Sequence, residues 1–130
     1  LKKRSQTPNI VFVAGIALTT DTSALTAVSN DLGFEHVFAR QVAGLARPGD
    51  VLIAISTSGK SKNVIKAVEQ AKDSGCKAIM LTGALTGASG EALLSLCDVV
   101  VSVPGTRTSR IQEAHITIGH LWCEMVDQLS

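Results

Sequence analysis

Residues Val51 to Ser61 read VLIAISTSGKS, and this stretch decides the fold. Its first half, Val51–Ser56, is a short apolar run rich in branched residues, which is typical of a buried strand. Its second half consists of small polar residues and glycine, which favour a loop. An amphipathic pattern over Asn63–Ser74 then predicts a helix that ends at Gly75. The stretch therefore indicates a strand that passes through a polar loop into a helix.

The same alternation of strands and helices continues on both sides of this stretch. We predict further strands over residues 9–14, 77–81 and 98–103. We predict further helices over residues 23–30, 35–45, 91–96 and 110–129, with loops over 82–90 and 104–109. Asp21 or Thr22 would cap the first of these helices. The alternation favours an α/β domain, a doubly wound parallel sheet flanked by helices.

The composition excludes several classes of protein. In 130 residues, 12 Lys and Arg oppose 11 Asp and Glu, and this balance argues against a nucleic-acid binder with a broad basic face. No apolar run reaches the roughly 18 residues that a membrane span needs, and we expect no membrane partner. We also expect no signal peptide, and the three cysteines have no CxxC spacing. Reduced thiols and a cytoplasmic location are the resulting expectations.

The loop after the Val51–Ser56 strand is the best candidate for a binding site, because ligands of parallel sheets lie beyond the carboxyl ends of the strands. Ser56, Thr57, Ser58 and Ser61 place four hydroxyls beside a helix N-terminus, whose free N–H groups and dipole favour an anion. The loop is neither GxGxxG nor GxxxxGK[ST], so a phosphate monoester fits better than a dinucleotide or a nucleoside triphosphate. The alternative is that Ser58 and Ser61 only cap the helix.

This loop resembles the sugar-phosphate-binding loop of the SIS (sugar isomerase) domain. Other segments carry the resemblance further: TTDTSALTA at 19–27, FARQV at 38–42, RIQEAH at 110–115 and IGH at 118–120. Together they are similar to the bacterial phosphoheptose isomerase (sedoheptulose 7-phosphate isomerase) family over nearly the whole chain from Ile16 onward. The resemblance implies a SIS domain, with the flavodoxin-like three-layer sandwich of that family.

The resemblance also implies a reaction. The family interconverts D-sedoheptulose 7-phosphate and D-glycero-D-manno-heptose 7-phosphate through an enediol, in the synthesis of heptose and lipopolysaccharide precursors. Such a proton transfer needs an acid, a base and electrostatic help at the oxygens. Ser56, Ser58 and Ser61 match the family's phosphate-binding serines, Thr57 matches a substrate-contacting threonine, and Asp31 matches an aspartate that contacts the sugar. Read without the resemblance, Asp31 could be a turn residue.

Two residues of the closing helix match the family's catalytic and zinc site. His120 is the acid/base candidate, and Gln112 and His120 are the expected contacts to zinc, with Gln112 also near the substrate. Without the resemblance, they would be a helix histidine and a surface glutamine. They lie eight residues apart, which on a helix means about 80° and roughly 12 Å. The family's homotetramers, with sites at subunit interfaces, would ease this separation.

Part of the family's pattern is missing. Members carry a glycine-rich loop after the first strand and then a helix with a histidine and the catalytic glutamate. Here Val11–Gly15 resembles that strand and the opening glycine, and Ile16 continues with residues that follow later in the family. If the strand before Gly15 and the apolar stretch from Ile16 belong to two parallel strands, a crossover of a dozen or more residues must lie between them. We therefore expect a single SIS domain over 1–130 that lacks the N-terminal helix and a segment between 15 and 16, and with it the catalytic glutamate.

Two other functions compete with the isomerase. One is a non-enzymatic SIS-domain adaptor of the replication-initiator-associating type, and the other is a phosphosugar-sensing domain of a transcription regulator. In the adaptor, the second loop serine and the closing-helix histidine are replaced, whereas this chain keeps Ser58 and His120. No helix-turn-helix or basic segment accompanies the chain. Both observations favour the isomerase.

Overall fold

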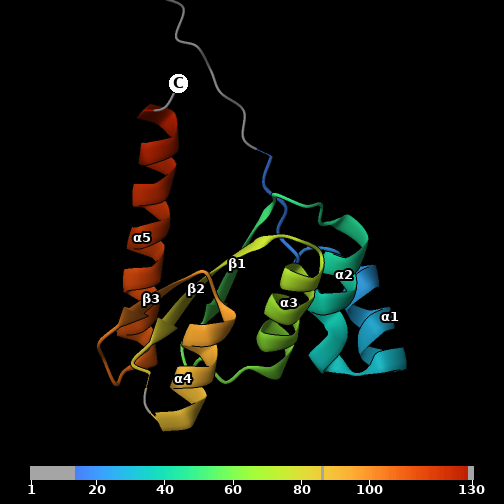
Figure 1. Cartoon of the computed structure of the whole chain (residues 1–130), viewed down its shortest axis with the longest axis horizontal. Coiled ribbons are helices and arrows are strands. Elements are labelled where there is room, and N and C mark those ends of the chain that lie inside the picture. The colour runs from blue at the N-terminus through green and yellow to red at the C-terminus, as the bar shows by residue number, and fades with distance from the viewer. Residues whose placement is uncertain (1–13, 86, 129–130) are drawn as a thin grey trace, which may run out of the picture.

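The computed structural model describes residues 14–85 and 87–128 and contains a parallel sheet with helices around it (Figure 1). The helices are α1 (Thr22–Leu32), the 3-10 helix η1 (Phe34–His36), α2 (Val37–Leu45), α3 (Lys62–Asp73), α4 (Gly87–Leu96) and α5 (Thr108–Gln128). The strands are β1 (Val51–Ser56), β2 (Lys77–Gly83) and β3 (Val99–Val103). None of the helices described is long and apolar enough to cross a membrane.

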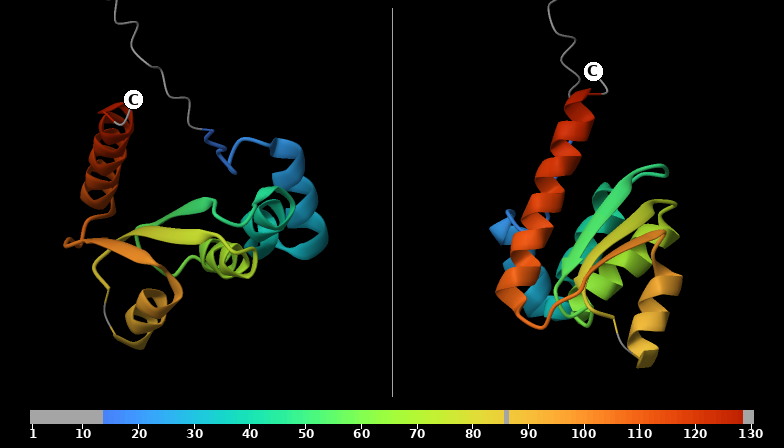
Figure 2. Two further views of the ribbon diagram at one scale, coloured as in Figure 1. Left: turned by 45° about the horizontal axis from the view of Figure 1, so that its top comes forward. Right: turned by 90° about the vertical axis from the view of Figure 1, so that its left-hand side faces the viewer.

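The three strands are parallel and follow one another in the order β1-β2-β3. Ser56 of β1 is opposite Thr82 of β2, and Gly83 of β2 is opposite Val103 of β3. Helices α3 and α4 lie on one side of the sheet and α5 lies on the other, while α2 packs against α3 and α1 packs against α2 (Figure 2). This arrangement confirms the predicted α/β class, with helices on both faces of a parallel sheet.

The buried core lies between the sheet and the helices α3 and α4. Its centre consists of small and aliphatic side chains from both strands and helices: Ala54, Val68, Ala78, Met80 and Leu93. A second cluster joins α2 to α3 through Val42, Ala67, Ala71 and Cys76.

Most predicted elements are confirmed, and the differences lie at their ends. Thr82 and Gly83, which we expected in a loop, belong to β2 because they pair with β1 and β3. Helix α4 begins at Gly87 instead of 91, although glycine and serine are weak helix formers. The helix expected over 35–45 is divided into η1 and α2. Of the strand expected over 9–14, residues 9–13 lie outside the described residues, and Ala14 is not in a strand.

The carboxyl end of β2 holds two other parts of the chain together. The Gly83 amide donates a hydrogen bond of 3.0 Å to the carbonyl of Thr57, in the loop after β1. A Cβ at Gly83 would lie 2.5 Å from the Thr57 oxygen and 2.8 Å from Cδ1 of Ile111, in the first turns of α5. Only glycine allows this approach without movement of a neighbour. The absent side chain of Gly83 thus allows the loop and α5 to meet at one point.

We expect Gly83→Ala to lower the free energy of unfolding by about 1–3 kcal/mol, because the added methyl overlaps a backbone oxygen and a side chain. Gly44→Ala is the matched control: a Cβ on this α2 residue would meet nothing within 4 Å, and alanine should raise helix stability by up to about 1 kcal/mol. Urea unfolding of both variants measures the difference. Equal midpoints for the two variants would contradict the close packing at Gly83.

Candidate functional site

The loop from Ser56 to Ser61 turns sharply between the end of β1 and the start of α3. The amide of Gly59 donates to the carbonyl of Ser56 over 3.0 Å, which closes the turn. Gly59 has φ +64°, a left-handed conformation that favours glycine. A Cβ there would lie only 3.1 Å from Oγ1 of Thr82 and 3.2 Å from the side chains of Leu85 and Leu93. Backbone conformation and space both require glycine at this position.

The first turn of α3 has no cap from the side chain at its N-cap position. Ser61 occupies that position, but its hydroxyl makes no capping hydrogen bond. Instead, Ser61 Oγ lies 2.9 Å from Ser56 Oγ and shares a hydrogen bond with it. The alternative that Ser61 only caps the helix is therefore wrong. The Val64 amide already donates to the Ser61 carbonyl and to Oδ1 of Asn63. The amides that precede it, at the start of α3, and the positive end of the helix dipole are the groups that suit an anion.

The four predicted loop residues differ in their access to solvent. Ser58 is exposed, and its Oγ accepts a hydrogen bond of 3.2 Å from the amide of Lys60. Thr57 and Ser61 are half-buried, whereas Ser56 is only 6% exposed. The four residues therefore lie together, and Thr57, Ser58 and Ser61 can be reached from the solvent. Ser56 lies beneath them, bonded to Ser61.

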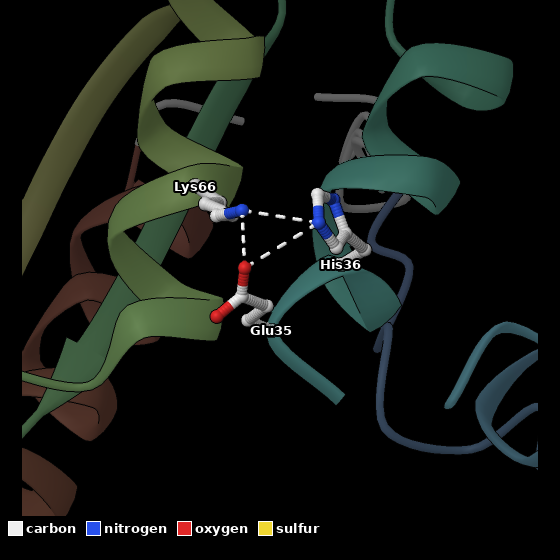
Figure 3. A network of polar contacts seen from close by, with 3 residues as sticks. All are labelled: Glu35, His36 and Lys66. Atoms are coloured by element: carbon white, nitrogen blue, oxygen red, sulfur yellow. Dashed lines mark hydrogen bonds and ion pairs between the residues drawn. The ribbon is translucent and has the colours of Figure 1, made fainter. Parts of the chain in front are cut away.

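Asp31 lies in the last turn of α1, exposed, and its Oδ1 accepts a hydrogen bond of 2.8 Å from Asn30. No contact joins its side chain to the loop within the part of the chain that the structure describes. The segment that follows Asp31 is nevertheless attached to α3 (Figure 3). Lys66 of α3 donates to Glu35 over 2.6 Å and to Nε2 of His36 over 3.0 Å. This network ties the chain after α1 to the helix whose N-terminus borders the loop.

The charge of Lys66 also changes the acidity of its partner. The hydrogen bond from Lys66 lowers the pKa of the Glu35 carboxyl below its ordinary value of 4.5, the positive charge of Lys66 adds to the effect, and Lys62 contributes less. The Glu35 and Lys66 side chains are 40% and 33% exposed, so solvent weakens their attraction. The carboxylate stays ionised under neutral conditions, and the network keeps its ion pair.

The two expected residues of the closing helix are both exposed on α5. Gln112 follows Ile111, which is buried beside Gly83, so the start of α5 lies next to the loop. His120 lies eight residues further along a single continuous helix of 21 residues. At about 1.5 Å per residue, the two side chains cannot both reach one ion with bonds of about 2.0–2.2 Å. In residues 14–85 and 87–128, no group of three or more His, Cys, Asp or Glu could hold a metal ion either.

One residue at this end of the sheet was missed by the sequence analysis. Thr82 is fully buried, and its Oγ1 has no hydrogen-bond partner among the described residues. Its carbonyl accepts a hydrogen bond of 3.1 Å from Nε2 of His115, a histidine of α5 that is only 5% exposed. There was little indication of its role in the sequence, because Thr82 directly follows the apolar run 77–81 and was expected to be the first residue of a loop. Thr82 contacts the Ser56–Ser61 loop on one side and α5 on the other.

The fold and the loop define a class: an α/β domain with a serine-rich loop between the carboxyl end of a parallel strand and the start of a helix. The family model for the SIS domain matches residues 7–83, so the chain belongs to the SIS domain family. This finding agrees with the resemblance stated for the loop.

Similar proteins narrow the class. The chain is 58% identical over 113 residues to a phosphoheptose isomerase of a Nitratiruptor species, an alignment that covers 87% of this chain and 58% of that protein. It is 50% identical over 127 residues to a phosphoheptose isomerase of Rhodospirillum rubrum, covering 98% of this chain and 62% of the other. The solved structure of a phosphoheptose isomerase from Neisseria gonorrhoeae superposes with a TM-score of 0.80 at 50% identity, covering 87% of this chain and 61% of that one. The chain thus spans about three fifths of the length of these relatives.

We expect Glu35→Gln to lower the free energy of unfolding at pH 7. The difference between variant and parent should disappear on acidification. A depressed pKa in the folded state stabilises the protein above the unfolded pKa, and this contribution disappears as the pH falls through the folded value, below 4.5. Urea midpoints of parent and variant, from pH 7 down to about pH 3, measure the convergence.

Glu69→Gln removes the same charge from an exposed position on α3 and is the control. A stability difference for Glu35→Gln that stays constant over the whole pH range would show that the ion pair with Lys66 does not contribute.

Proposed function

We propose that this chain is the core of a phosphoheptose isomerase, which converts D-sedoheptulose 7-phosphate to D-glycero-D-manno-heptose 7-phosphate for the synthesis of heptose and lipopolysaccharide precursors. One observation carries the proposal: Ser61 stands at the N-cap of α3 but turns its hydroxyl to Ser56, so that this hydroxyl does not bond an amide at the start of the helix. The relatives, all named phosphoheptose isomerase, support a sugar phosphate as that anion.

In this proposal the loop binds the phosphate and so orients the sugar. Ser58 and Ser61 donate hydrogen bonds to the phosphate oxygens, Thr57 contacts the substrate, and Asp31 binds a sugar hydroxyl. Isomerisation then moves a proton between C1 and C2 through an enediol, which needs an acid and a base near those carbons. His120 is the acid/base residue of this chain, and Gln112 contacts the substrate from the start of α5. Fixing the phosphate holds the reacting carbons in a constant position.

We propose that the active form is a homotetramer with sites at subunit interfaces. The side chains that support this are large, apolar and exposed: Val51, Ile53 and Ile55 of β1, and Ile116, Leu121 and Met125 of α5. Large apolar side chains that are exposed close together mark interaction sites, and Val51, Ile53 and Ile55 alternate along one strand. The second half of α5 projects beyond the sheet, where it is accessible to another subunit (Figure 2).

Zinc is a further part of the proposal. Gln112 and His120 of one chain do not fit a shared ion, because a straight helix holds them about 12 Å apart. They fit only if each contributes to a different site, together with residues of a neighbouring subunit. Zinc would supply electrophilic help at the substrate oxygens when bound.

Two further expectations stay predictions. The first is that Gly15 and Ile16 flank an absent loop and helix that include the catalytic glutamate, in which case the 130 residues alone lack the base. The second is a cytoplasmic location. The non-enzymatic adaptor and the sensing domain are the alternative functions, and both would bind a sugar phosphate without converting it.

We expect the full-length gene product to convert sedoheptulose 7-phosphate to the aldose, and His120→Ala to lose about 10²-fold or more of that activity. Product formation is followed directly, with and without added zinc. Thr117→Ala is the control, since this exposed hydroxyl of α5 bonds only the carbonyl of Glu113 in its own helix. Binding of the sugar phosphate without turnover in the parent would replace the isomerase with the adaptor or the sensor.

We expect Leu121→Glu to dissociate the tetramer, because it places a charge on the exposed apolar side of α5. Light scattering gives the mass, and elemental analysis of each fraction gives the zinc content, which should fall with dissociation. Gln128→Glu adds the same charge at the exposed end of the helix and should leave the tetramer intact. A monomeric parent with full activity would refute both the assembly and the interface zinc site.

A further inference from the structure

We propose that Thr82 is a positioning residue for the anion loop: its buried hydroxyl donates to Ser56 Oγ when an anion is bound, and so directs the hydrogen of Ser61 toward that anion. The inference rests on the proposed function only in that it assumes a phosphate at the loop. It adds a residue that neither the sequence pattern nor the family resemblance assigned.

The first argument concerns the direction of the hydrogen bond between Ser56 and Ser61. Their hydroxyls lie 2.9 Å apart, and either could be the donor. A hydroxyl has one hydrogen to donate and two lone pairs that accept. If Ser61 donated to Ser56, it would present only lone pairs to a bound anion, which would repel it. An anion at the loop therefore requires Ser56 to donate to Ser61, so that the Ser61 hydrogen remains for the anion.

The second argument is that Ser56 needs a donor of its own. Once Ser56 donates to Ser61, the lone pairs of Ser56 are free. A hydrogen bond donated to those lone pairs polarises the Ser56 hydroxyl and so strengthens the bond from Ser56 to Ser61. Ser56 is buried, so bulk water has little access to it. The donor must then come from the protein at the end of β1.

Thr82 is placed to be this donor. It is the register partner of Ser56 on β2, and neighbouring strands lie about 4.8 Å apart with paired side chains on the same face. Its hydroxyl is directed toward the loop, because Oγ1 lies 3.1 Å from the position of a Cβ on Gly59. Thr82 is fully buried, and Oγ1 has no partner among the described residues. Rotation about the Cα–Cβ bond can turn the hydroxyl toward Ser56.

A buried hydroxyl without a partner is costly, which argues for a partner in another state of the site. The backbone of Thr82 is held firmly, since its carbonyl accepts from His115 and the next amide, that of Gly83, donates to Thr57. The hydroxyl is thus the one group of this residue that is free to respond when the loop takes up an anion.

The test uses the full chain and inorganic phosphate as the probe, with calorimetry for affinity and urea unfolding for stability. Thr82→Val keeps the shape and removes the hydroxyl, and Thr82→Ser restores it. We expect Thr82→Val to weaken phosphate binding about 5-fold without lowering stability, since the ligand-free hydroxyl has no partner, and Thr82→Ser to recover most of the affinity. In a Ser56→Ala background, Thr82→Val should change the affinity little, because the acceptor is gone.

A merely structural role predicts the opposite pattern, with stability lost and affinity retained, and that result would overturn the inference. So would an equal loss of affinity in the Ser56→Ala background. A parent that turns over sedoheptulose 7-phosphate while Thr82→Val binds phosphate normally would refute the role of Thr82 and leave the isomerase standing. Weaker phosphate binding by Thr82→Val in a protein with no turnover would support Thr82 and refute the isomerase.

Discussion

The hydrogen bond from the Gly83 amide to the Thr57 carbonyl is the contact on which the site depends. It joins the end of β2 to the loop after β1, at a point where a side chain on Gly83 would displace both Thr57 and Ile111. The loop can therefore keep its turn at Gly59, and α5 can begin beside it. The carboxyl ends of parallel strands lie at the same edge of a sheet, and ligands of such sheets bind there. The bond between Gly83 and Thr57 holds the loop after β1 in place at this edge.

The same edge explains why the loop suits an anion. A serine at an N-cap normally satisfies one of the first amides of its helix. Here Ser61 bonds Ser56 instead, so the local sequence preference for a cap gives way to a hydrogen bond across the loop. The start of α3 loses this cap at the cost of some helix stability. Such a conflict between local preference and structure is expected at functional sites.

In the proposed tetramer, helix α5 divides the site between chains. Its first turns pack on Gly83 and Thr82, through Ile111 and His115, whereas its second half leaves the sheet. Gln112 therefore lies near the loop of its own chain, and His120 is carried away from it by a helix that has no break. This geometry suits a site that needs more than one subunit, and such an assembly would cover the apolar side chains of α5 that are exposed in the single chain.

The sequence by itself determined the order of the strands and helices, because the apolar periodicity and the glycine after α3 are local signals. It also predicted the loop as an anion site, since hydroxyls, glycine and a helix start follow one another in six residues. Only the tertiary structure decided that β2 extends to Gly83, that Ser61 does not cap α3, and that Thr82 lies beneath Gly59. The extent of β2 and the place of Thr82 depend on pairing between residues that are distant in sequence, and the Ser56–Ser61 bond depends on the folded shape of the loop, so no local pattern records any of the three.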